Sequence, residues 1–130
     1  MKRILKFSLS VTLTLLFINC SSDDNNSTQE TIPVTIIGDW SGAFSGGDNG
    51  TWNINVSSTG EVTGTGISNT FSDNYTFNGN VTSNGSITAT TGTADTGATF
   101  IGVLNTNGTA SGTWDNQSEG LSGNWQGNRD

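Results

Sequence analysis

The residues of this chain that could carry chemistry are few. It has eleven Asp and Glu residues, one cysteine (Cys20) and no histidine, and its only bases are Lys2, Arg3, Lys6 and Arg129. Histidine-based acid–base catalysis, serine–histidine hydrolysis and the usual zinc sites therefore have no residues to build on. A carboxylate pair, as in glycoside hydrolases, remains possible, but such sites are typical of larger, grooved folds. We therefore expect a protein that is not an enzyme.

Cys20 lies where an apolar segment ends and an acidic, serine-rich stretch begins. Residues 1–6 carry three cations and residues 7–18 none, which is the pattern of a secretory signal peptide. The apolar part is shorter than the roughly 20 residues that span a bilayer. A cysteine at this position resembles the lipobox of bacterial lipoproteins, in which the thiol is acylated and becomes the new N-terminus. The stretch 21–24 is similar to the export signal of surface lipoproteins in the Bacteroidota.

This resemblance implies a domain organisation and a location. Residues 1–19 are expected to be a lipoprotein signal peptide, and residues 20–37 a lipidated cysteine followed by a flexible tether. The protein would then be anchored in the outer membrane through lipid on Cys20 and exposed on the cell surface. A buried free thiol and an intermolecular disulfide are the alternatives for Cys20, and both require a folded domain beside it.

Charge narrows the possible partners. Loss of residues 1–19 would leave one base, Arg129, against all eleven acids. Nucleic acids and anionic lipid headgroups are bound by clustered Lys and Arg side chains, which this part of the chain lacks. We expect no nucleic-acid partner, and the acidity by itself also suits solubility on a crowded surface.

The remainder of the chain has the pattern of an antiparallel β-sheet. All 18 glycines occur from Gly38 onward, and short runs rich in Thr, Val, Ile and aromatic residues alternate with turn clusters, without helical periodicity. The expected strands are 39–45, 51–57, 61–68, 75–82, 86–91, 98–105, 109–114 and 121–127. Tight turns with Gly or Asn-Gly alternate with longer loops. The pattern predicts an all-β domain over residues 38–130: an eight-stranded antiparallel up-and-down meander that closes into a small barrel.

Alternate connections of such a meander lie at opposite ends of the barrel. One end should therefore have the tight turns and both termini, and the other the longer loops. The longer loops carry the acidic residues Asp48, Asp73, Asp95, Asp115 and Glu119. The four aspartates are candidate calcium ligands, because calcium prefers several oxygen atoms, although turn chemistry alone also accounts for acidic residues in loops. No other cofactor is expected.

Glycines and bulky residues occur two positions apart in several of the expected strands, as in Trp40, Gly42 and Phe44. Residues two apart lie on the same face of a strand. Glycine weakens a strand, so its recurrence beside aromatic residues needs a reason. A narrow barrel interior supplies one, because it holds large side chains only where small ones lie next to them.

Two features resemble the calycin superfamily. The first expected strand opens with the triplet Gly-Asp-Trp, which ends at Trp40, and Arg129 follows the last strand; in calycins a first-strand Trp packs against a last-strand Arg or Lys and closes the barrel. The Gly-x-Trp pairs are most similar to the avidin branch. Trp114 matches a ring that stacks on biotin in avidins, but Phe100 and Gly64 stand where that site has other residues. We therefore do not expect biotin binding.

Two interpretations of function follow from this fold. In the first, the domain is a structural or interaction module displayed on the cell surface, and its rings fill the interior of the barrel. In the second, Trp52, Phe77, Phe100 and Trp114 line a pocket for a small apolar or sugar-like ligand at an outward acidic mouth. The sequence favours the first and leaves the second as the alternative.

Overall fold

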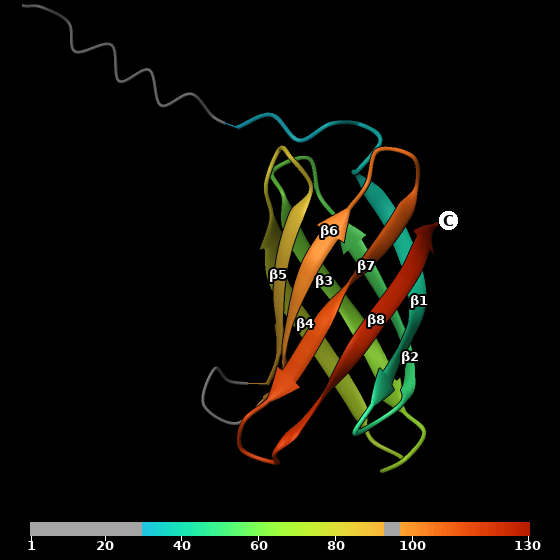
Figure 1. The fold of residues 1–130 in the computed structure, drawn as a ribbon. Helices are drawn as coiled ribbons and strands as arrows, with labels where there is room; N and C mark the ends of the chain where they lie inside the picture. The colour runs from blue at the N-terminus through green and yellow to red at the C-terminus, as the bar shows by residue number, and fades with distance from the viewer. Residues whose placement is uncertain (1–29, 93–96) are drawn as a thin grey trace, which may run out of the picture.

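Eight antiparallel strands follow one another around a closed barrel (Figure 1). The computed structural model describes residues 30–92 and 97–130. Its strands are β1 (Gly38–Gly46), β2 (Gly50–Val56), β3 (Glu61–Ser68), β4 (Asn74–Val81), β5 (Ser86–Thr91), β6 (Thr99–Leu104), β7 (Thr109–Asn116) and β8 (Leu121–Arg129). Each strand pairs with the next, and β8 pairs with β1 to close the barrel. The described residues include no helix that is long and apolar enough to cross a membrane.

The predicted fold class, an eight-stranded up-and-down barrel, is confirmed. β7 and β8 each run two residues further than expected. The reason is pairing: Asn116 lies opposite Leu121 across the β7–β8 hairpin, and Arg129 lies opposite Trp40 of β1. The eight strand pairings that close the barrel, and its hydrophobic core, are formed by residues 30–92 and 97–130.

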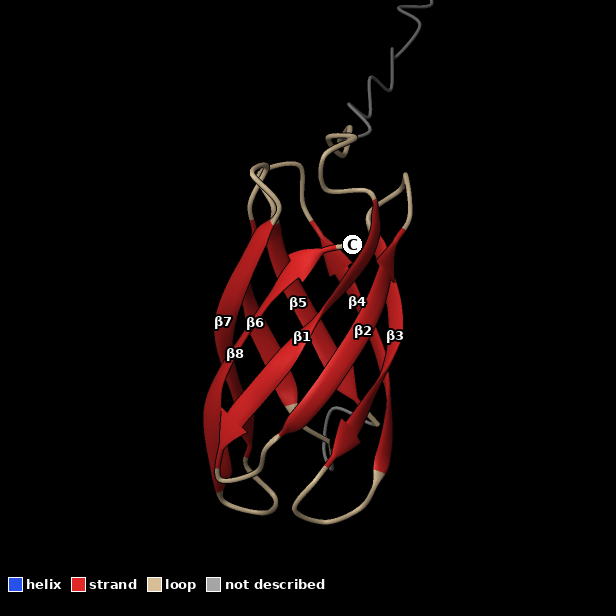
Figure 2. Cartoon of the chain, turned by 90° about the vertical axis from the view of Figure 1, so that its right-hand side faces the viewer, coloured by secondary structure: helices blue, strands red, loops and turns tan. Residues whose placement is uncertain are grey.

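The two ends of the barrel differ, as the alternating connections predicted (Figure 2). We call the end with the tight turns the turn end and the opposite one the loop end. Gly60, Gly85 and Gly108 occupy the tight turns with φ angles of 83°, 85° and 86°, which side-chain-bearing residues rarely adopt. The loop end has the connections 47–49, 69–73, 92–98 and 117–120. The C-terminus and the segment that leads into β1 lie at the turn end (Figure 1).

Side chains fill the middle of the barrel. Along β2, Gly50, Trp52, Ile54 and Val56 are buried and the residues between them are exposed, as expected for a strand with one face toward a core. Trp52 meets Trp125 of β8 edge to face, with ring centroids 5.6 Å apart. These two indoles occupy the centre of the interior, so the barrel is not hollow throughout.

Glycines make the space for these two rings. A Cβ atom at Gly42 would lie 2.6 Å from the Trp52 ring, and one at Gly112 would lie 2.6 Å from the Trp125 ring. The prediction that glycines provide room for large side chains is confirmed. The ring that fills each gap comes from a neighbouring strand, since Gly42 is on β1 and Trp52 on β2.

The folded domain begins before the boundary expected at Gly38. Ile32 and Ile36 are only 4% and 1% exposed and belong to the hydrophobic core. A turn follows Pro33, whose carbonyl accepts a hydrogen bond from the backbone N–H of Ile36 at 2.9 Å. Residues 32–37 therefore form a plug across the turn end instead of the last part of a tether. We call this segment the N-terminal plug.

The residues expected to close the barrel, Trp40 and Arg129, both bind this plug. The Trp40 indole, which is fully buried, donates a hydrogen bond to the Ile36 carbonyl at 2.8 Å. The Arg129 guanidinium donates to the carbonyls of Ile37 at 2.7 Å and Val34 at 3.4 Å. Trp40 and Arg129 lie opposite each other in the pairing of β1 with β8. Together they close the turn end by fixing the plug.

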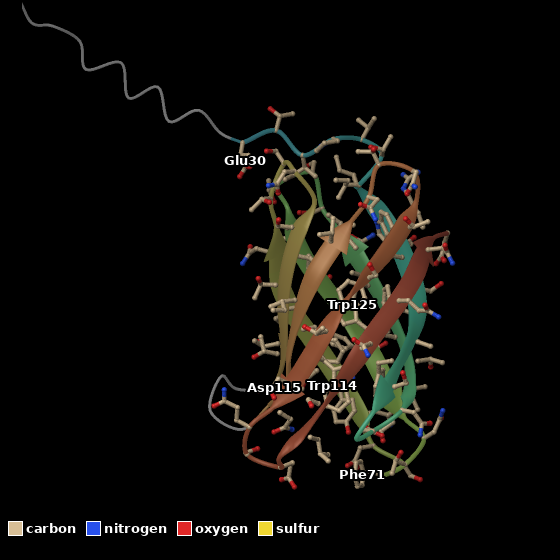
Figure 3. The ribbon with its side chains drawn as sticks, in the orientation of Figure 1. Glu30, Phe71, Trp114, Asp115 and Trp125 are labelled. Atoms are coloured by element: carbon tan, nitrogen blue, oxygen red, sulfur yellow. The ribbon has the colours of Figure 1, made fainter. Side chains whose placement is uncertain are left out.

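A further contact ties the start of the described chain to this end. The Glu30 carboxylate accepts hydrogen bonds from the Ser83 backbone N–H at 2.9 Å and from the Ser83 hydroxyl. These bonds hold the pKa of Glu30 below its usual value. Figure 3 shows Glu30 at the turn end, far from the loop end.

Truncation of Ile36 tests the plug. We expect Ile36→Ala to lower the free energy of unfolding by about 2 kcal/mol, because a fully buried aliphatic side chain leaves a cavity. Val34, in the same turn, is 78% exposed, so Val34→Ala should change it by less than about 0.5 kcal/mol. Urea denaturation measures both. Equal effects of the two substitutions would contradict the role of the plug.

Candidate functional site

The hollow part of the barrel is at its loop end. There the strands and loops enclose a cavity of about 330 Å³, which we call the cup. Its floor is aromatic and its rim is acidic: Phe44, Phe100 and Trp114 form the floor, and Asp48, Asp73 and Glu119 lie on the rim. A cavity of this size is at the small end of the range for ligand sites.

The floor is a packed cluster of rings from three strands. Phe100 of β6 and Trp114 of β7 stack with an interplanar angle of 19° and centroids 6.1 Å apart. Phe44 of β1 meets Trp114 edge to face at 5.9 Å. The Trp114 indole donates a hydrogen bond to the Ser45 carbonyl at 3.1 Å, which fixes the ring. In Figure 3, Trp114 lies toward the loop end and Trp125 nearer the middle of the barrel.

Asp48 turns inward from the β1–β2 loop. Its side chain is only 5% exposed although it is ionisable. Oδ1 accepts hydrogen bonds from the Asn49 backbone N–H at 2.7 Å and from the Ser68 hydroxyl at 2.8 Å. Oδ2 has one long contact, with the Tyr75 hydroxyl at 3.4 Å. The carboxylate thus lies on the inner side of the rim, held mainly through one of its two oxygens.

Ser68 joins two of the long loops. Its hydroxyl donates to Asp48 in the β1–β2 loop and accepts a hydrogen bond from the Phe71 backbone N–H at 2.9 Å in the β3–β4 loop. The Asn69 backbone N–H also donates to the Asn49 carbonyl at 2.8 Å. This network holds one side of the cup in a defined shape and places Phe71, which is 51% exposed, at the entrance.

Tyr75 provides a spectroscopic test of this network, because it is the only tyrosine of the chain. Burial raises the pKa of its hydroxyl above the ordinary value of 10.0; a hydrogen bond with Ser68 lowers it in part, and the charges of Asp48 and Asp73 raise it. We expect Asp48→Asn to lower the Tyr75 pKa, because it removes one of these charges. Ultraviolet titration of the phenolate measures the change.

The sign of the associated stability change follows from linkage. When the pKa of a phenol is higher in the folded than in the unfolded state, its contribution to stability is fully present below the unfolded-state pKa, where the phenol is neutral in both states. The contribution is lost as pH rises through the folded-state pKa. The free energy of unfolding should therefore fall as pH rises above about 10. Asp115→Asn, at a carboxylate that is not among the causes of the shift, is the control. A Tyr75 pKa that Asp48→Asn leaves unchanged would contradict the arrangement.

The charges around the cup have one sign. Asp48, Asp73 and Glu119 all line it, and no Lys or Arg of the described part of the chain does. Among the described residues the only base is Arg129, whose guanidinium binds the plug at the turn end. The electrostatic potential of the cup is therefore negative.

Two of the four predicted ligand-binding residues line the cup, and two do not. Phe100 and Trp114 form its floor. Trp52 and Phe77 lie deeper and face a void of about 20 Å³, which is large enough for no more than a water molecule. In the middle of the barrel the aromatic rings therefore fill the interior, as in the first interpretation. Among the described residues, the barrel is open only at the loop end.

The predicted calcium ligands are not gathered at one point. Asp48 and Asp73 line the cup, Asp115 lies in a separate groove with Thr113 and Gln117, and Asp95 lies outside the described residues. Within residues 30–92 and 97–130, no three His, Cys, Asp or Glu residues come close enough to hold a metal ion. Calcium binding stays a prediction. Cys20 and the predicted signal peptide also lie outside the described residues.

Several residues of the cup were not predicted. Phe44 was expected on the interior face with Trp40, but not as part of a binding site. Tyr75 has the same parity as Phe77, so alternation could have placed it inside. Phe71 belongs to a loop and has no such signal.

Comparison of the chain with protein-family models gives no match, and comparison with curated protein sequences gives none either. The function must therefore be inferred from the geometry of the cup.

Proposed function

We propose that this protein is a lipid-anchored surface protein whose barrel binds a small ligand in the cup, without catalysing a reaction. The observation that carries the proposal is the distribution of empty space. The barrel is filled at its middle and plugged at the turn end, yet it keeps a cavity of about 330 Å³ at the loop end. A barrel that served only as a displayed block would have no need of a defined cavity over an ordered aromatic floor.

The position of the cup suits this role. The described chain begins with Glu30 at the turn end, opposite the loop end (Figure 3). A tether running from Glu30 to lipid on Cys20 would hold the turn end toward the membrane and the cup away from it. Ligands outside the cell would then reach the cup directly.

The lining defines the general chemistry of the ligand. The floor of Phe44, Phe100 and Trp114 can cover one apolar face of a small molecule, and such rings also stack on sugars. The carboxylates of the rim offer polar contacts around the edge of this aromatic floor. The ligand should therefore be amphipathic, with a flat or apolar body and at least one polar group.

Blocking the cup tests the proposal. Ala98 lines the cup and is nearly buried, so Ala98→Leu should fill part of it. We expect residues 21–130, which contain the whole barrel, to increase the fluorescence of the neutral dye N-phenyl-1-naphthylamine. Ala98→Leu should weaken this binding about tenfold or more, because a ligand that no longer fits loses its apolar contacts.

The matched control is Ala43→Leu, at an exposed position on the outer face of β1. It makes the same chemical change away from the cup and should leave dye binding unchanged. Absence of dye binding to the unaltered protein, or equal binding by both variants, would contradict the proposal. A role as a displayed interaction module would then be the better interpretation.

A further inference from the structure

The cup combines two features that together select one class of ligand. Among the described residues its rim has three carboxylates and no base, and its floor has three aromatic rings. Aromatic faces attract cations, with tryptophan the most effective, and carboxylates bind cations directly. An inference about ligand charge rests on the proposed function, since it concerns the same cup.

Asp48 is the residue that points most clearly to a cationic group. The residue is 5% exposed, and the one base among the described residues lies at the other end of the barrel. Burial of a charge is unfavourable unless an opposite charge or several hydrogen bonds compensate it. Within residues 30–92 and 97–130, Oδ1 has two hydrogen bonds, but Oδ2 has only the 3.4 Å contact with the Tyr75 hydroxyl. A donor with a positive charge would complete this site.

The floor defines the rest of the ligand. Trp114 and Phe100 stack on each other, and Phe44 meets both rings edge to face. All three residues are more than nine-tenths buried, and the parts of them that line the cup form an apolar base under the rim. Phe71 lies at the entrance with half of its surface exposed. A ligand with a flat apolar body could rest on the floor while its charged end reaches Asp48.

We propose that the cup binds a small organic ammonium ion with an aromatic or similarly flat apolar body. The ammonium group lies at Asp48, within the field of Asp73 and Glu119, and the apolar body lies over Trp114 and Phe100. An inorganic cation fits less well, because it needs several oxygens at one point and no three acidic residues of the described chain converge in this way. An anion would be repelled by the rim.

A set of three probes that differ mainly in charge tests this proposal. Each probe has a phenyl ring on a short chain. 2-Phenylethylammonium is positively charged, 2-phenylethanol is neutral and 3-phenylpropionate is negatively charged. Isothermal titration of residues 21–130 at low ionic strength should show that the ammonium ion binds at least about tenfold more tightly than the alcohol, because a charge-assisted hydrogen bond replaces a neutral one. The propionate should show no binding.

Two substitutions locate the effect. Asp48→Asn keeps an oxygen that can accept hydrogen bonds from Ser68 and Asn49 but removes the charge. It should weaken binding of the ammonium ion about tenfold and leave binding of the alcohol unchanged. Asp73→Asn alters an exposed rim residue that carries little risk to the fold, and it should weaken ammonium binding about twofold to fivefold. Glu61→Gln, at the turn end, also removes one negative charge, but far from the cup. It should change neither the binding of the ammonium ion nor that of the alcohol.

The possible outcomes separate this inference from the proposed function. Equal binding of the ammonium ion and the alcohol would overturn the inference while the cup remains a ligand site. An ammonium preference that Asp48→Asn and Asp73→Asn leave intact would also overturn it, because the cation would then bind elsewhere. No binding of any probe, together with no binding of the neutral dye, would overturn the proposed function itself.

Discussion

Replacement of Trp125 by alanine is expected to lower the free energy of unfolding by about 3–5 kcal/mol, the usual cost of truncating a large buried aromatic side chain. The Trp125 ring fills the centre of the barrel against Trp52, at 5.6 Å between centroids. Its indole N–H donates to the carbonyls of Ile101 and Thr113, both at 3.1 Å. The substitution therefore removes a large buried surface and the hydrogen bonds that fix it. Urea denaturation at neutral pH measures the change.

The neighbouring residue provides the control. Gln126 lies next along β8, but its side chain is on the exposed face. Gln126→Ala should change the free energy of unfolding by less than about 0.5 kcal/mol. If Trp125→Ala cost no more than Gln126→Ala, the barrel could not be filled as described, and its middle would have to be open.

An opposite change, the addition of one methyl group at Gly112, should be comparably damaging. A Cβ atom there would lie 2.0 Å from the Ile101 backbone oxygen and 2.6 Å from the Trp125 ring. A backbone atom of a neighbouring strand cannot move away without disturbing the β6–β7 pairing. We expect Gly112→Ala to lower the free energy of unfolding by more than about 3 kcal/mol, at or above the upper part of the usual range for overpacking.

Ser111→Ala is the matched control, because Ser111 precedes Gly112 on β7 and faces outward. It should change the free energy of unfolding by less than about 0.5 kcal/mol. Combination of Gly112→Ala with Trp125→Ala should cost less than the sum of the two, since the smaller side chain at 125 removes part of the clash. Simple additivity would show that the Trp125 ring is not what Gly112 accommodates.

The strands of the barrel were predictable because their signals are local. Alternation of buried and exposed residues and the glycines of the tight turns are properties of a few consecutive residues, and they placed β3 (Glu61–Ser68) and β5 (Ser86–Thr91) with the correct bounds. The order of the strands around the barrel also followed, because tight hairpins make neighbours in sequence neighbours in space.

The depth of a side chain inside the barrel was not predictable in the same way. Trp52 lies near the start of β2, so it was expected at the mouth. Its ring instead packs against Trp125 in the space that Gly42 and Gly127 leave. Alternation tells which face a residue occupies, but strand tilt and the reach of an indole decide its height along the axis.

The N-terminal plug was missed for a related reason. Ile32, Val34 and Ile36 alternate with Pro33 and Thr35, which suits a lead-in strand as well as the end of a tether, and nothing in this pattern indicates a turn that buries two of them. Their burial depends on the open turn end of a barrel that forms from residues later in the chain. Only the assembled fold shows that Gly60 and Gly85 lie beside these two isoleucines.

The cup was predictable in outline but not in its detail. The position of the longer, acidic loops at one end followed from the alternation of turn types, and Phe100 and Trp114, two of the residues expected to line a pocket, do line the cup. The inward turn of Asp48 was not foreseen, because it depends on the Ser68 hydroxyl of another strand. Long-range hydrogen bonds of this kind leave no pattern in the sequence.

The four tryptophans allow the most direct test of the central claim, which is that the barrel is filled at its middle and open only at the loop end. The measurement is a nitrogen-15 spectrum of the indole N–H groups of residues 21–130, recorded while 2-phenylethylammonium and, separately, 2-phenylethanol are added. Trp114 lines the cup, whereas Trp40 is fully buried at the turn end. The Trp114 signal should shift with at least one probe, and the Trp40 signal with neither. Unchanged signals from all four indoles, or a shift of Trp40 as large as that of Trp114, would contradict the claim.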